Sequence, residues 1–145
     1  YAFGLNQFEN VNAGYRERGS LFKDKLIQNI GQYIESLTGG NAGFYLYLTL
    51  KEISTFTDSN LFKLLSRKSG IKYWDYDASN KVNKRVVYLP GIHCVHPQGT
   101  LSETGKYQLR VSYGYENISA LLQAVDIFES AIELMKTKNI IHIEK

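Results

Sequence analysis

The sequence contains a single cysteine, Cys94, in 145 residues, so no disulfide can form within the chain. A lone thiol favours a reducing compartment, and we expect a cytoplasmic protein. No apolar run approaches the roughly 20 residues of a membrane helix, and the charged, apolar and small-residue order of a signal peptide is not found. These features predict neither secretion nor a membrane partner.

An excess of charge of one sign is also lacking. The chain has 17 lysines and arginines against 14 acidic residues, a formal net charge of +3, and the basic residues are spread among the carboxylates. A protein that binds nucleic acid usually gathers its basic residues in a patch or stripe. The sequence therefore predicts no nucleic-acid partner.

The familiar motifs for phosphate binding and nucleophilic catalysis are missing too: G-x-G-x-x-G, G-x-x-x-x-G-K and G-x-S-x-G do not occur. Two short S-x-x-K matches begin at Ser20 and Ser69, but the companion S-D-N and K-T-G sequences are absent. Ser20 and Lys23 are better explained as neighbours on one helix. We predict no catalytic residue in this chain.

Two further patterns have simpler explanations. His93, Cys94 and His96 are metal-ligand types, but their spacing matches no common structural zinc site and no fourth ligand is near. We interpret them as part of an ordinary loop and predict no metal site. Asn117-Ile118-Ser119 fits a glycosylation sequon, although Asn117 or Ser119 is better explained as the cap of the last helix.

What is present indicates one globular domain over residues 1–145. The chain is 43% hydrophobic and 21% charged, with eleven tyrosines and seven phenylalanines against one tryptophan, so we expect an aromatic interior with several half-exposed rings. It opens on Tyr1 rather than methionine and enters a helical pattern almost at once. We expect a piece of a longer protein.

The first half of the sequence predicts a helix, a strand and a second helix. Apolar residues spaced three and four apart predict a long helix from Phe8 to Leu37, ended by the glycines at 39 and 40. The run GFYLYLTL, residues 43–50, predicts a central strand that is apolar on both faces. Thr57 or Asp58 can cap the next helix, which we expect to stop at Gly70.

The second half predicts a hairpin, a strand and a closing helix. Residues 71–76 and 85–89 are predicted to form two strands joined by a polar turn. Pro90 and Gly91 are expected to break the second of these strands. Residues 92–105 are expected to form a loop, and the last helix runs from Ile118 to about Lys136. The order of elements predicts an α/β two-layer sandwich, with a small mixed or antiparallel sheet covered on one face by helices.

The strand before the last helix contains one unexpected charge. In KYQLRVSYGYENIS, residues 106–119, the apolar Leu109, Val111 and Tyr113 alternate with a polar set that includes Arg110. The simplest interpretation is a solvated arginine on a sheet face. The alternative is that its guanidinium binds a ligand.

Several stretches in a fixed order give the chain a resemblance to a known family. They are YRERGSLFKDKL, GGNAGFYLYLTL, NLFKLLSRKSGI, LPG and YQLRVSYGYENISALLQAVDIFESAIEL, and they span nearly the whole chain. In this order they resemble the C-terminal small domain of fold-type I, class I/II aminotransferases, which depend on pyridoxal phosphate (PLP). In that family, a G-G-x-F sequence introduces the strand and an R-(L/V)-(S/N) strand leads into the closing helix.

The resemblance implies a substrate-binding domain that closes over an amino acid or 2-oxo acid, while the large domain of the same protein supplies PLP. It implies that Arg110 binds the substrate α-carboxylate, since arginine matches the two oxygens of a carboxylate. It also implies a homodimeric parent protein. The Schiff-base lysine and the other PLP-binding residues would lie upstream of Tyr1, so the chain alone is expected to be inactive.

The chain departs from the family pattern in two places. The segment from Lys72 to Tyr88 stands where the family has only a few residues, and Ile92-His93-Cys94 follows the proline-glycine turn where the family often has phenylalanine. The substrate-side loop and the amino acid preference are therefore expected to differ.

Two alternative functions remain open from the sequence. The resemblance extends to bacterial transcription regulators with an aminotransferase-like domain, in which PLP and amino acid binding serve as a switch. A free-standing interaction module with no ligand is the other alternative. The sequence upstream of Tyr1 would distinguish them.

Overall fold

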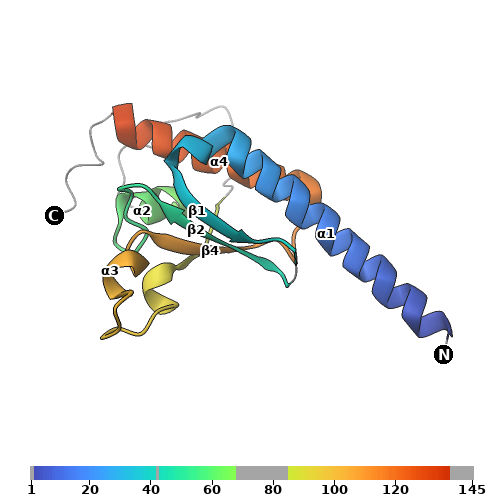
Figure 1. Ribbon diagram of the computed structural model, residues 1–145. Coiled ribbons are helices and arrows are strands. Elements are labelled where there is room, and N and C mark those ends of the chain that lie inside the picture. Colours follow the sequence, from blue (N-terminus) through green and yellow to red (C-terminus); the bar gives the residue numbers. More distant parts are fainter. Residues whose placement is uncertain (1, 42, 68–84, 138–145) are drawn as a thin grey trace.

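A four-stranded sheet with two long helices packed on one face forms the centre of the structure, a computed structural model that describes residues 2–41, 43–67 and 85–137 (Figure 1). In chain order the elements are α1 (Ala2–Ile30), η1 (Gly31–Tyr33), β1 (Ile34–Gly39), β2 (Tyr45–Leu50), α2 (Asn60–Ser66), β3 (Leu89–Pro90), η2 (Gly91–His93), α3 (Ser102–Gly105), β4 (Gln108–Ser112) and α4 (Ile118–Thr137). The strand order is β1-β2-β4-β3, and every neighbouring pair is antiparallel. The predicted α/β two-layer sandwich is confirmed, as is the central place of β2.

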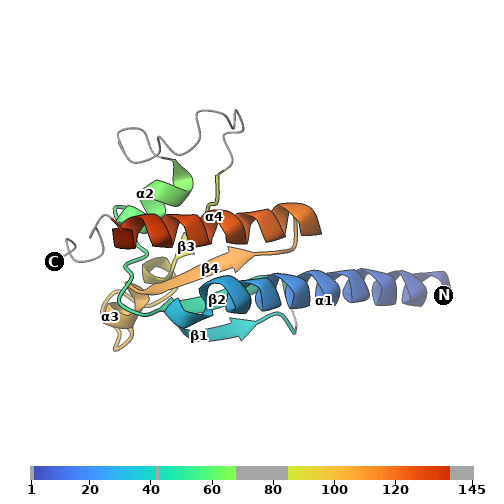
Figure 2. The same cartoon turned by 90° about the horizontal axis from the view of Figure 1, so that it is seen from above.

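The helix layer consists of α4 and the C-terminal half of α1, which lie side by side over the sheet (Figures 1 and 2). Their apolar stripes meet the sheet in a shared core. Its largest fully buried side chains are those of Tyr113, Ile30, Leu46, Leu48, Leu50, Leu61, Leu64, Leu65, Leu109, Ile132, Met135 and Val125. Along the outside of the helix pair, Lys25 forms an ion pair with Asp126 (3.0 Å) and Asn29 donates to Glu129 (2.6 Å).

The N-terminal half of α1 projects beyond the sheet (Figure 1). Phe8 is 71% exposed and Val11 48% exposed, although both continue the helix face that buries Phe22 and Leu26 further along. Among the described residues no helix, α1 included, has the length and apolar character of a membrane span.

The prediction that the first helix runs to Leu37 is wrong, because α1 ends at Ile30 and residues 34–39 form the edge strand β1. Ile34 and Leu37 are three residues apart, which is a helical spacing. A bulge between Ile34 and Ser36 adds one residue to the strand, so Ile34 pairs with Leu50 and Leu37 with Leu48 on the same face. A bulged strand thus reproduces the apolar spacing of a helix.

The second helix, α2, begins with a different cap from the two predicted residues. Ser59, not Thr57 or Asp58, is the N-cap, and its hydroxyl accepts a hydrogen bond from the Phe62 amide at 3.1 Å. The helix closes at Arg67, whose backbone is left-handed with a φ of 51°. The predicted stop at Gly70 lies outside the described residues.

The predicted hairpin is only partly described, since its first strand, residues 71–76, and its turn lie outside the described residues. Of the second strand, predicted over 85–89, only Leu89 pairs with β4. Pro90 is the last residue of β3 and η2 begins at Gly91, so the strand ends where the proline-glycine pair predicted. Val86 instead donates its backbone N–H to Leu65 of α2. Val86 is thus bonded to α2 and not to β4, and the pairing with β4 begins only at Leu89.

The last part of the chain follows the prediction closely. The strand β4 and the helix α4 lie where they were expected, and the Asn117 side chain accepts from the Ala120 amide at 2.8 Å, as a helix cap does. The expected loop over 92–105 contains two short helical turns, η2 and α3.

Candidate functional site

Two faces of the sheet differ in character. Leu46, Leu48 and Leu109 point toward α1 and α4 and are at most 1% exposed. Because side chains alternate along a strand, the residues between them lie on the opposite side, here called the outer face. Its members on β1, β2 and β4 are Ser36, Thr38, Tyr45, Tyr47, Thr49, Gln108, Arg110 and Ser112.

Arg110 lies near the middle of the outer face. It is paired with Tyr47 of β2 on one side and with Leu89 of β3 on the other, and its side chain is half-buried. Its chain neighbours Leu109 and Val111 point into the core. Arg110 therefore faces away from the helix layer, as a ligand-binding role requires, while that role itself stays a prediction.

The guanidinium of Arg110 lies over the ring of Tyr45, with its central carbon 4.4 Å from the ring centroid. Tyr45 is the diagonal neighbour, since its direct partner on β4 is Ser112. This is a cation–π arrangement, in which the cation lies over the face of the ring. The N–H groups at the edge of the guanidinium plane are not used by the ring.

No carboxylate within residues 2–41, 43–67 and 85–137 pairs with Arg110. The ion pairs found in that part of the chain are Lys25 with Asp126 and Lys106 with Glu103. An anionic ligand at Arg110 would thus not have to displace a protein carboxylate of the described residues.

Beside Arg110, a chain of hydrogen bonds crosses three strands of the outer face. Ser36 donates to the Thr49 hydroxyl at 2.8 Å, and the Gln108 amide donates to the same hydroxyl at 3.3 Å. The Tyr47 hydroxyl donates to the side-chain carbonyl oxygen of Gln108, Oε1, at 2.9 Å. These bonds fix the neutral polar groups around the guanidinium.

The phenol of Tyr47 has a perturbed pKa. Burial raises its pKa above the ordinary value of 10.0, the Cys94 thiol adds to the rise, and the Arg110 guanidinium opposes it. Tyr47 is therefore a neutral hydrogen-bonding group at physiological pH.

The His93, Cys94 and His96 loop does not gather its side chains into one site. The Cys94 thiol is exposed and lies 4.0 Å from the Pro90 carbonyl oxygen. His96 Nδ1 accepts a hydrogen bond from the backbone N–H of Gln98 at 3.2 Å. Within the described part of the chain, no three His, Cys, Asp or Glu side chains are grouped as a metal ion requires.

The S-x-x-K matches also gain no support as a nucleophile site. Ser20 donates to Asp24 one turn away at 3.4 Å, as an ordinary helix residue does. The second match, at Ser69, lies outside the described residues.

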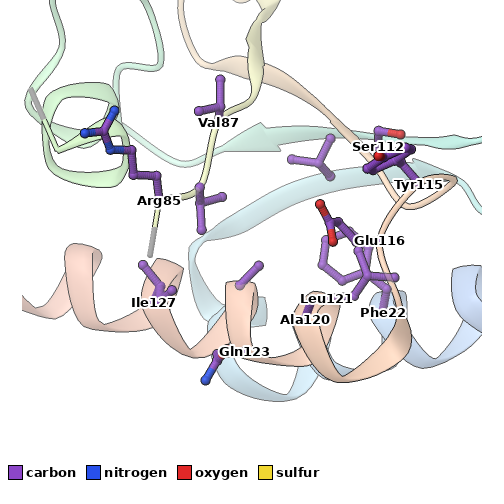
Figure 3. Close-up of a pocket in the computed structure, with 13 residues that line it drawn as sticks. Phe22, Arg85, Val87, Ser112, Tyr115, Glu116, Ala120, Leu121, Gln123 and Ile127 are labelled. Atoms are coloured by element: carbon purple, nitrogen blue, oxygen red, sulfur yellow. The ribbon is translucent and has the colours of Figure 1, made fainter. Parts of the chain in front are cut away.

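A cavity of about 540 Å³ lies between β4, the start of α4 and the segment from Arg85 to Val87 (Figure 3). Its lining is largely apolar, with Phe22, Leu121 and Ile127 among the side chains. In the close-up, Arg85 extends toward α2. Arg110 does not line this cavity, so the candidate site is the outer face.

Sequence reasoning found Arg110 but missed the residues around it. The prediction that GFYLYLTL, residues 43–50, is apolar on both faces is wrong, because its alternation places Tyr45, Tyr47 and Thr49 on the face opposite to the leucines. The partner Gln108 shares the parity of Arg110 in its own strand. Only the pairing of β2 with β4 brings these residues together.

Comparison of the chain with protein-family models, with curated proteins and with solved structures finds no match.

Proposed function

We propose that this chain is the substrate-binding small domain of a cytoplasmic, PLP-dependent aminotransferase, and that Arg110 binds the α-carboxylate of the amino acid or 2-oxo acid. The observation that carries the proposal is the position of Arg110 on the outer face, away from α1 and α4 and without a carboxylate partner among the described residues. The resemblance in sequence order adds the reaction class.

The chemistry of the group fits this role. A guanidinium presents paired N–H donors in one plane, and a carboxylate accepts two of them at once. Every amino acid and 2-oxo acid carries a carboxylate next to the carbon that reacts. Holding that carboxylate fixes the orientation of the substrate, so the binding contact also serves the geometry of the reaction.

Cofactor binding is assigned to none of the residues of this chain. The four strands of the described sheet contain no lysine. Lys106, which lies just before β4, forms an ion pair with Glu103. PLP, when bound, serves as the electron sink for the bonds at the α-carbon. In the proposal, the residues that hold it belong to a large domain of the same protein.

An alternative with the same site is an effector-binding domain of an aminotransferase-like transcription regulator. There Arg110 would bind an amino acid as a signal, and no amino group would be transferred. A stand-alone interaction module would have no small-molecule ligand at Arg110.

An assay on the complete protein that contains this chain separates the three functions. The protein is supplied with PLP, a panel of amino acids and a 2-oxo acid, and both binding and transfer of the amino group are measured. We expect turnover that the Arg110→Gln variant loses. Binding without turnover would favour the regulator, and neither binding nor turnover would contradict the proposal.

A further inference from the structure

The contact between Tyr45 and Arg110 differs from the ion pairs of the described residues. The guanidinium is held by an aromatic ring at 4.4 Å, whereas the ion pairs of the described part use other basic residues. A neighbouring carboxylate would hold an arginine more strongly but would occupy the donors that a carboxylate ligand needs. A ring orients the guanidinium and leaves those donors available.

We propose that Tyr45 is the positioning residue of the site: its ring fixes the guanidinium plane of Arg110 so that the edge N–H groups face the carboxylate of the ligand. This inference rests on the proposed carboxylate role of Arg110. It adds a residue that binds no ligand atom itself and acts through Arg110.

The two tyrosines near Arg110 differ in what they can do. Tyr47 is the direct cross-strand partner, but its hydroxyl donates to Gln108 and so holds its ring in the polar network. Tyr45 is 45% exposed, and the Arg110 guanidinium lies over its ring. The guanidinium therefore leans toward Tyr45, the end of the sheet where β2 begins.

The neighbour on β4 leaves room for this arrangement. Ser112 is the direct partner of Tyr45 and is small and exposed.

An arginine side chain has many rotamers, and restricting it costs conformational entropy. When the ring restricts the side chain before the ligand arrives, less of that cost falls on binding.

The experiment follows the Nε–Hε signal of Arg110 in the ¹⁵N-labelled chain by NMR, assigned from its loss in Arg110→Lys. The variants are Tyr45→Leu, which removes the ring, Tyr45→Phe, which keeps it, and Thr38→Val, a control elsewhere on the outer face. The mobility of the Nε–Hε group is measured from ¹⁵N relaxation. Binding is measured by titration with pyruvate, with chloride at equal ionic strength as the reference.

We expect Tyr45→Leu to raise the mobility of the guanidinium and to weaken pyruvate binding about three- to tenfold. Tyr45→Phe and Thr38→Val should match the parent chain in both measurements. Tyr45→Gln provides a second ring-free variant, and the backbone amide spectrum checks that each variant is folded.

Two failures are distinguishable. If the parent chain binds pyruvate at Arg110 and Tyr45→Leu binds it equally well with unchanged mobility, Tyr45 is not a positioning residue although the proposed function stands. If pyruvate affects Arg110 no more than chloride does in the parent chain, the carboxylate role fails and the role of Tyr45 fails with it. A loss in Tyr45→Phe as large as in Tyr45→Leu would also overturn the inference, since the ring is then not what matters.

Discussion

Tyr47 and Arg110, both in the described part of the chain, stand directly opposite each other on β2 and β4, yet no hydrogen bond joins their side chains. The Tyr47 hydroxyl donates to Gln108, and the Arg110 guanidinium turns to the ring of Tyr45. The sheet therefore separates a neutral hydrogen-bonding network from a cation on the same face. This separation keeps the guanidinium donors available for a ligand.

The raised pKa of Tyr47 predicts a specific response to alkaline pH. The folded state holds the Tyr47 proton more tightly than the unfolded state, where the pKa is near 10.0. Its contribution to stability is thus complete below pH 10.0 and is lost as the pH rises through the raised folded-state pKa. We expect Tyr47→Phe to lose less stability than the parent chain between neutral pH and pH above 10.0, as measured by urea denaturation.

The phenolate absorbance provides the matching control. Tyr47→Phe should remove the part of the parent chain's absorbance that develops at the high-pH end of the titration, because burial raises the pKa of Tyr47 above 10.0. If Tyr47→Phe instead removes absorbance that develops at or below pH 10.0, the predicted shift of Tyr47 is wrong.

Adjacent residues of β4 should have opposite effects on stability and binding. Leu109 is fully buried and pairs with Leu48 in the core, so Leu109→Ala is expected to cost about 2–5 kcal/mol of unfolding free energy. Arg110→Gln removes a half-buried cation–π contact and should cost about 1 kcal/mol or less. Urea denaturation of both variants measures the two costs, and a large loss in Arg110→Gln would indicate a structural role for the guanidinium.

Sequence patterns predicted the parts of the fold in which local and tertiary preferences agree. The strand β4 has strict alternation, and α4 has a polar cap at Asn117 and a continuous apolar stripe. At β1 the two preferences conflict, because the bulge places Ile34 and Leu37 on one face at a helical spacing. No local pattern reveals such a bulge, since it depends on the register with β2.

The same limit applies to the candidate site. Arg110 could be selected from the sequence because a charge in a strand is unusual. Tyr45 is 65 positions away in the chain, and its contact with Arg110 exists only because β2 and β4 are neighbours in the sheet. The topology, which sequence alternation does not encode, therefore completes the site.

The chain alone is expected not to hold PLP as a stable adduct, because the proposal places the Schiff-base lysine in another domain. The purified chain is mixed with PLP, treated with borohydride and analysed for modified lysines. Scattered, weak modification of exposed lysines is expected for any protein. A stoichiometric adduct on a single lysine would contradict the prediction.

Removal of metal ions should leave the stability unchanged. A structural zinc contributes much of the folding free energy of a small site, whereas His93, Cys94 and His96 form no metal cluster among the described residues. We expect the same melting temperature with and without a chelator. A large drop that zinc restores, and that Cys94→Ser abolishes, would show that this loop binds a metal ion.

The most direct prediction concerns the charge-conserving change at Arg110 in the complete protein. Lysine keeps the positive charge but cannot offer two coplanar donors to a carboxylate. Losing one charged hydrogen bond corresponds to roughly 1.5–3 kcal/mol, so Arg110→Lys should raise the apparent KM for the amino acid by about one to two orders of magnitude. PLP binding, followed by its absorbance, should be nearly unaffected.

Arg85→Lys serves as the matched control, because Arg85 is exposed and lies away from the outer face. An unchanged KM in Arg110→Lys, or an equal rise in Arg85→Lys, would show that the guanidinium of Arg110 does not hold the substrate carboxylate.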